Sequence, residues 1–311
     1  SCSARSTTAK WNRCGMVKGI LIEEQFDSTN ENGQLALFSS HFRKEAIIMK
    51  EITTEKLRRF NLIMGGLHLI QGITMLFLAT NVIQKIGEFS PEISQFYLAF
   101  NPETRSLETA SRVLFELPFG VMVASFLFIS AIAHALVSIP KKLNEIYNAD
   151  LVKGINKFRW FEYALSSSIM IVLIATLFGI YDIASLILIF IVNATMNLFG
   201  LVMEQLNVGR SKDNIEWGPF IWGSIAGVAP WIAILLYMFG TGNFGEVPWF
   251  VWAIVGTYFV AFNTFPINMI LQYKKVGKWA DYLYGERVYI VLSLVAKSIL
   301  AWLVLFGAMQ P

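Results

Sequence analysis

Seven apolar blocks, each long enough to cross a lipid bilayer, constrain this chain more than any other feature of its sequence. A membrane-spanning helix needs about 20 mostly apolar residues. The bilayer core offers the backbone no hydrogen-bonding partners, so single blocks of this kind fold as helices. Charged residues make up only 15% of the chain, whereas soluble domains have about 25%. The sequence therefore predicts an all-α, multi-pass protein of a cell membrane, a bundle of seven transmembrane helices. The blocks cover residues 60–83, 113–139, 158–180, 182–206, 217–240, 248–273 and 287–309.

Two segments fall outside this pattern. Residues 1–48 are polar, and they lack both helical periodicity and the apolar core of a signal peptide. They precede Met49-Lys50-Glu51-Ile52, which reads like a bacterial start, so we expect a disordered tail or an artefact of upstream translation. Residues 49–311 are expected to form one seven-helix membrane domain. The longest loop, residues 84–112, has Ser90-Pro91 and Asn101-Pro102 around an aromatic run, which favours a short hairpin.

The distribution of Lys and Arg between the loops predicts the orientation in the membrane, because cytoplasmic loops carry the excess of cations. Fifteen cations lie before the first block or in the loops on the same side, against three on the other side. We therefore expect a cytoplasmic N-terminus and an extracellular C-terminus, the reverse of seven-helix receptors and ordinary microbial rhodopsins. The fifteen are Lys50, Lys56, Arg58, Arg59, Lys141, Lys142, Lys153, Lys157, Arg159, Arg210, Lys212, Lys274, Lys275, Lys278 and Arg287, and the three are Lys85, Arg105 and Arg112.

Several classes of function are disfavoured by the sequence. A net charge of +3 is too small to suggest a nucleic-acid partner. The two cysteines, Cys2 and Cys14, lie outside the apolar region and offer neither a disulfide framework nor a metal site. The chain shows no nucleotide-binding loop, no metal motif and no Ser/His/Asp arrangement. We therefore expect neither an enzyme nor a metal-binding protein.

One lysine, Lys297, lies in the middle of the last apolar block. A lysine at mid-bilayer costs at least about 2.5–3.5 kcal/mol on insertion scales, and such a residue is by default a candidate functional group. A structural lysine paired with a carboxylate inside the bundle is one interpretation. The other is attachment of an aldehyde as a Schiff base, because a desolvated lysine is a nucleophilic amine.

A protonated Schiff base needs a counter-ion, and few acids lie within the blocks. They are Glu116, Glu162, Glu204 and, at a helix edge, Asp182. The depths of Glu162 and Lys297 need not match if the third helix begins in the preceding loop, near Lys153. The spacing permits this pairing but does not prove it. From spacing alone, a pair of Glu162 with Lys297 is no more favoured than a pair of Glu162 with Arg159. Glu116 suggests no function.

Several motifs resemble heliorhodopsins, over about residues 57–309. The stretch 285–298 (GERVYIVLSLVAKS) with Ala301-Trp302 is similar to the last helix of that family. Further similarity to its third to sixth helices lies in 159–163 (RWFEY) with 166–168 (SSS), 193–196 (NATM), Pro230-Trp231, and Phe262-Asn263 with 272–274 (QYK). The reversed orientation is also what that family shows.

The resemblance implies all-trans retinal on Lys297, with Glu162 as its counter-ion and Ser293 hydrogen-bonded near the Schiff base. It also implies a dimer in the membrane lipid. Asn193, Met196, Pro230, Trp231 and Phe262 are implied as pocket residues, although those that are Met, Pro or aromatic could equally be ordinary packing. His68, Ser130 and His134 match a polar cluster on the cytoplasmic side of the chromophore, where the histidines are either proton acceptors or interhelical donors. Glu204 with Arg287 either lines a cytoplasmic cavity or forms an interface pair.

The third block argues against a proton pump. In typical pumps its helix carries two acids eleven residues apart, and eleven residues after Glu162 is Leu173. We therefore expect a photoreceptor whose slow conformational change is read by a cytoplasmic partner. The alternative is a light-driven transporter or light-gated channel passing protons through Glu116, Glu162 and Glu204.

Overall fold

The computed structural model describes residues 31–82, 90–240 and 249–308, in two units, Ser1–Glu51 and Ile52–Pro311. The described part of the first unit is helical and belongs to α1, Glu31–Phe77. Residues 31–48, for which we expected a disordered tail or an artefact of upstream translation, have helical structure. This segment contains no proline, has a single glycine, Gly33, and is otherwise rich in residues that favour helices. Residues 1–30 of the expected tail lie outside the described residues.

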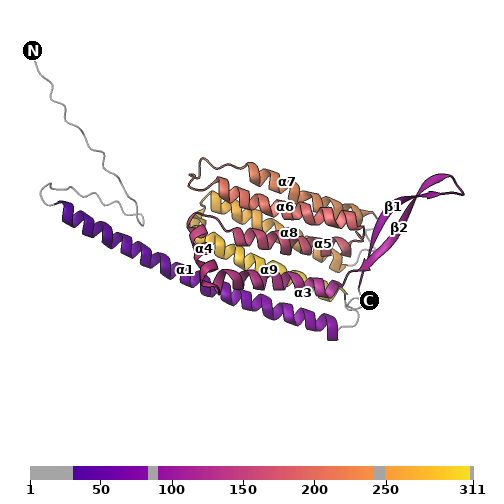
Figure 1. Ribbon diagram of the computed structural model, residues 1–311, viewed down its shortest axis with the longest axis horizontal. Coiled ribbons are helices and arrows are strands. Elements are labelled where there is room, and N and C mark those ends of the chain that lie inside the picture. The colour runs from indigo at the N-terminus through magenta and orange to yellow at the C-terminus, as the bar shows by residue number, and fades with distance from the viewer. Residues whose placement is uncertain (1–30, 83–89, 241–248, 309–311) are drawn as a thin grey trace, which may run out of the picture. The chain divides into compact units, whose positions relative to one another are not determined.

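Within the described residues, seven helices are long and apolar enough to cross a membrane, which confirms the predicted fold. Figure 1 shows α3 and α5–α9 lying side by side with their axes in nearly the same direction. The first span, Thr54–Asn81, comprises part of α1 and most of a short π-helix, Leu78–Val82. The other six helices are α3 (Phe119–Ser138), α5 (Lys157–Leu177), α6 (Ile183–Leu206), α7 (Gly218–Phe239), α8 (Trp249–Tyr273) and α9 (Tyr282–Ala308).

Helix α5 is the most enclosed of the seven. In its most apolar window 61% of the residues are buried, against 22% in α7 and in α8. Its C-terminal half, including Ile171, Leu173 and Ile174, belongs to the main apolar core together with Phe126 and Leu127 of α3. The charged residues of α5, Lys157, Arg159 and Glu162, lie in its N-terminal half, where the candidate site lies.

An antiparallel hairpin extends from one end of the helices (Figure 1). Strands β1 (Glu92–Asn101) and β2 (Ser106–Glu116) pair from Glu92↔Glu116 to Asn101↔Ser106, which confirms the predicted hairpin. The second span was predicted to begin at residue 113, but β2 continues to Glu116 and α3 begins at Phe119, after Pro118. Glu116, which we placed in that span, is an exposed strand residue.

The hairpin is attached to the turn between α5 and α6. The backbone N–H of Ser94 donates to the carbonyl of Tyr181 at 2.9 Å. In the same turn Asp182 caps α6 and accepts from the backbone and the hydroxyl of Ser185, both at 2.8 Å. Slight burial acts against ionisation, but these hydrogen bonds outweigh it and hold the pKa of Asp182 below its usual value.

A helix between the second and third spans was not predicted. Helix α4, Lys141–Val152, follows Pro140 and lies at the opposite end of the bundle from the hairpin (Figure 1). Its buried residues Tyr147 and Leu151 pack with Leu57 and Val137. A four-residue 3₁₀ turn, Gly277–Ala280, precedes α9. Seven spans with the hairpin at one end and α4 at the other match the predicted alternation of loops.

The orientation itself is a testable prediction. We expect an epitope added after Pro311 to be reached by antibody on intact cells, because the excess of loop cations predicts that the opposite side is cytoplasmic. An epitope before Ser1 is the matched control and should be reached only after lysis. Protection of the C-terminal epitope until lysis would contradict the predicted orientation.

Candidate functional site

Lys297 lies in the interior of the bundle, with 3% of its surface exposed. Its Nζ donates to Oε1 of Glu162 at 2.6 Å and to the hydroxyl of Ser293, one turn earlier on α9, at 2.9 Å. A buried ion pair is stable only when its geometry is good and further hydrogen bonds satisfy the remaining polar atoms. Both conditions are met here, so the structure brings together the three residues that the sequence singled out around the amine.

Glu162 receives a second donor from α3. The hydroxyl of Ser130 donates to the same Oε1 at 2.6 Å, so α3, α5 and α9 meet at one carboxylate. Glu162 lies only five residues after the start of α5, whereas Lys297 lies fifteen residues after the start of α9. The two reach the same depth because α5 begins inside the bundle, at the buried cap Asn156. Helix α5 begins at Lys157, close to the predicted start of the third block, and does not extend back to Lys153.

The two histidines lie beside this group, in contact with each other. The rings of His68 and His134 are stacked with centroids 5.6 Å apart. Nδ1 of His134 is 2.8 Å from Oδ1 of Asn61, a partner that the sequence did not suggest. Both ring nitrogens of the buried His68 lack a hydrogen-bond partner among the described residues. A cavity of about 40 Å³, large enough to hold water, lies beside Glu162. Polar and apolar side chains line it, the polar ones including Asn61, Ser130, His134, Asn156, Arg159, Glu162 and Ser293.

A second buried group of charges surrounds the start of α5. The guanidinium of Arg159 pairs with both Glu204 of α6 and Glu286 of α9. Asn156 donates two further hydrogen bonds, from its backbone N–H to Glu204 at 2.8 Å and from its side-chain amide to Glu286 at 2.7 Å. The guanidinium carbon also lies 4.0 Å from the centre of the Tyr289 ring, a favourable position for a cation. We call Asn156, Arg159, Glu204 and Glu286 the arginine cluster.

The arginine cluster shows which charged residues are partners of Glu204 and Glu162. Glu204 pairs with Arg159 and not with Arg287, because Arg159 lies in the first turn of α5 and reaches inward. Glu162 is consequently not the partner of Arg159, as one interpretation held, but that of Lys297. Glu286 was missed, because the seventh span was predicted to begin at residue 287 whereas α9 begins at Tyr282.

Removal of the guanidinium should destabilise the fold strongly. Arg159→Ala leaves two buried carboxylates facing each other without a cation, and breaking a buried ion pair in this way costs about 3–5 kcal/mol. We expect a clear drop in the melting temperature of the purified protein in detergent. Arg210→Ala, which changes an exposed loop residue, is the control and should melt like the unchanged protein. Equal melting of Arg159→Ala and Arg210→Ala would contradict a stabilising role of the cluster.

The expected pocket residues fall into two groups, which we call the aromatic wall, on α7 and α8, and the second wall, on α6. The rings of Trp231 and Phe262 meet edge-on, with their centres 5.8 Å apart. Trp231 belongs to the main apolar core, and Phe262 packs against it. Pro230 is buried in α7 beside them. On the second wall, the amide of Asn193 donates to the hydroxyls of Ser167 and Ser168 at 2.9 and 3.0 Å. Met196 lies one turn further along α6.

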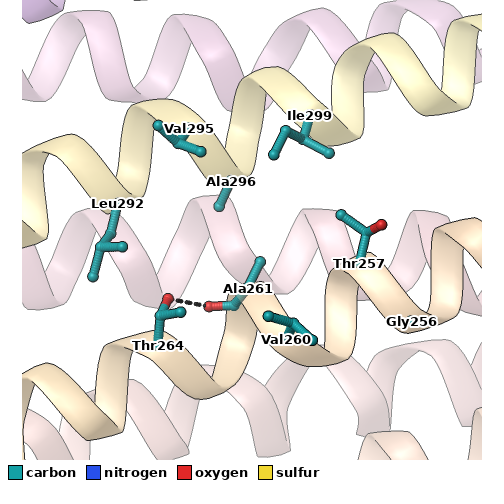
Figure 2. A pocket seen from close by; sticks show the side chains of 9 residues that line it. All are labelled: Gly256, Thr257, Val260, Ala261, Thr264, Leu292, Val295, Ala296 and Ile299. Atoms are coloured by element: carbon teal, nitrogen blue, oxygen red, sulfur yellow. Dashed lines mark hydrogen bonds between the residues drawn. The ribbon is translucent and has the colours of Figure 1, made fainter.

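A larger cavity lies elsewhere. A groove of about 430 Å³ lies between α8 and α9. Figure 2 shows the residues that line it, among them Thr264, which donates to the carbonyl of Ala261. Val260, Val295 and Ile299, which line it, are exposed on the outer surface. Ala296 is the only one of its lining residues adjacent in sequence to Lys297. The groove therefore faces the lipid and is separate from the buried amine. Its lining is Gly256, Thr257, Val260, Ala261, Thr264, Leu292, Val295, Ala296 and Ile299.

Seven apolar helices around a buried lysine that pairs with a carboxylate define an integral membrane protein of rhodopsin type. The family model named Heliorhodopsin matches residues 57–309, and the chain belongs to the heliorhodopsin family. This confirms the resemblance noted in its motifs. No curated protein matches the chain. Membership implies a retinal-binding rhodopsin, within a family of photoreceptors that are generally not enzymes.

Proposed function

We propose that the protein is a light-sensing photoreceptor in which all-trans retinal is attached to Lys297 as a protonated Schiff base. The observation that carries the proposal is the buried pair of Lys297 and Glu162, with the amine 2.6 Å from the carboxylate. An amine that condenses with an aldehyde at this position keeps its positive charge and retains the partner that stabilises it. When bound, retinal supplies a polyene that absorbs visible light and isomerises.

The chain's own residues have separate functions in this proposal. Glu162 is the counter-ion, and Ser130 and Ser293 hold the carboxylate and the nitrogen by hydrogen bonds. Asn193, Met196, Pro230, Trp231 and Phe262 line the pocket around the polyene. A mostly apolar and aromatic wall with a few polar groups suits such a ligand, and the contact between Trp231 and Phe262 supports this assignment.

The proton is expected to stay inside the protein. Glu162 has Ser130 and the small cavity beside it, and His68 and His134 lie next to this group. Towards the cytoplasm the next carboxylates, Glu204 and Glu286, are held by Arg159. The transporter alternative required Glu116 and Glu204 as further sites for protons. Glu116 is an exposed strand residue and Glu204 is part of the arginine cluster, so a sensor is favoured.

Helix α5 is the element that would carry the signal. Glu162 and Arg159 lie three residues apart, on one face of this helix. A change in charge at Glu162 therefore acts on the same helix end that the arginine cluster holds. We propose that a slow movement of this end is read by a cytoplasmic partner, and that the protein works as a homodimer in the membrane.

Two measurements test this function. The purified protein should gain a visible absorption band when all-trans retinal is added, and the absence of a band would overturn the proposal. Illumination of cells should then leave the pH of the bath unchanged, apart from changes that persist when a protonophore is present. A light-driven pH change that disappears with the protonophore would favour the transporter instead.

A further inference from the structure

Two glycines on α7 face α6 at close range. Gly223 and Gly227 form a G-x-x-x-G pattern, Gly-Ser-Ile-Ala-Gly, in which small residues let two membrane helices approach closely. A Cβ atom at Gly223 would lie 3.1 Å from Cβ of Phe199, and one at Gly227 would lie 2.6 Å from Sδ of Met196. Real Cβ atoms essentially never come as close as 2.6 Å. The Met196 thioether can therefore occupy its position only because Gly227 has no side chain.

Met196 belongs to a segment of α6 that is joined to α5 by hydrogen bonds. Asn193 and Asn197, on either side of it in α6, both donate to the hydroxyl of Ser167. Ser167 donates in turn to the carbonyl of Tyr163 at 2.7 Å, and the Tyr163 ring centre lies 5.3 Å from Nζ of Lys297. These contacts hold α6 against α5 at Ser167 and connect it, through Tyr163, to the surroundings of Lys297.

The same face of α7 continues into the aromatic wall. Pro230 and Trp231 follow Gly227 by about one turn, and Trp231 contacts Phe262. Gly227 and Trp231 lie four residues apart on one face of α7, so this face contacts Met196 at one turn and Phe262 at the next.

We propose that Gly227 is a positioning residue that keeps the Met196 sulfur against the chromophore and so helps to set the colour of the pigment. The inference rests on the proposed function. A thioether is polarizable, so next to a polyene it stabilises an excited state in which charge has moved along the chain. Gly227→Ala displaces the sulfur, and we expect the absorption maximum to move to shorter wavelength.

The test is a double-mutant cycle on the pigment with all-trans retinal. Met196→Ala should also absorb at shorter wavelength. In the Met196→Ala background, Gly227→Ala should add no further shift, because the contact it disturbs is already gone. The double variant also relieves the steric clash, so it keeps the test informative if Gly227→Ala alone folds poorly. Gly256→Ala is the matched control, since a Cβ there meets nothing within 4 Å, and Figure 2 shows Gly256 on the groove.

A second readout does not depend on colour. In protein carrying ¹³C-methyl methionine, the Met196 signal is assigned by its loss in Met196→Leu. Gly227→Ala should move this signal, while Gly256→Ala should leave it in place. An unchanged Met196 signal, an unchanged absorption maximum in Gly227→Ala, or an equal shift in both backgrounds would each overturn the proposal for Gly227. If the unchanged protein forms no pigment with retinal, the proposed function fails first, and this inference fails with it.

Discussion

A Lys297→Ala variant produced with all-trans retinal will be colourless, whereas the unchanged protein will be coloured and will bleach with hydroxylamine in the light. The amine of Lys297 is buried, and Glu162 and Ser293 hold it in place. Each other lysine whose burial the structure describes is exposed or half-buried, in α1, α4, the loops or the helix ends, and none is enclosed as Lys297 is. The expected effect is therefore complete loss of the visible band, measured by the absorption spectrum of the purified protein.

This variant needs a control for folding, because removing one partner of a buried ion pair leaves the other uncompensated. Lys297→Ala with Glu162→Gln removes both charges and should fold, yet remain colourless. Lys278→Ala changes a lysine of the exposed turn before α9 and should keep its colour. A coloured Lys297→Ala protein would end the interpretation of Lys297 as the site of attachment.

The seven spans could be predicted from the sequence because hydrophobic length alone determines them. The ends of the spans could not be predicted in the same way, because the residues around each end determine where the helix begins or stops. The second span was placed too early, since Val113, Leu114 and Phe115 are as apolar as a membrane helix but form the end of a strand. Helix α4 was taken for a loop, since its charged residues resemble those of a connection. Its start after Pro140 and its apolar residues at helical spacing are signals that could have revealed it.

The candidate site was predictable where one residue was unusual for its surroundings. Lys297 is such a residue, since a cation in an apolar block requires a partner. The partners of the other charges depend on how far each helix extends into the bundle, which hydropathy does not show. Arg159 was counted with the cytoplasmic loops, and Glu286 lay outside the predicted span. The structure places both in the interior, because α5 begins at a buried residue and α9 begins earlier than predicted.

Glu162→Gln should change both the colour of the pigment and its response to pH. A carboxylate within about 4–6 Å favours the charged form of its partner, and Glu162 is 2.6 Å from the nitrogen of Lys297. Without this anion the nitrogen gives up its proton more easily, so the visible band should be lost at a lower pH than in the unchanged protein. The anion also stabilises the dark state, where the positive charge lies at the nitrogen, more than the excited state. The remaining protonated pigment should therefore absorb further to the red.

Gln nearly keeps the shape of Glu162, so these effects report the charge and not the packing. The titration is followed by absorption in buffer without halide, because an anion from solution could replace the carboxylate. Glu116→Gln is the clean control, since Glu116 is exposed at the end of β2 and should change neither quantity. Glu204→Gln is a weaker control, because it disturbs the pair with Arg159 and with it the start of α5, although its effect on colour should still be smaller. If Glu162→Gln leaves the spectrum and the titration unchanged while Glu116→Gln shifts them, the counter-ion has been assigned to the wrong element.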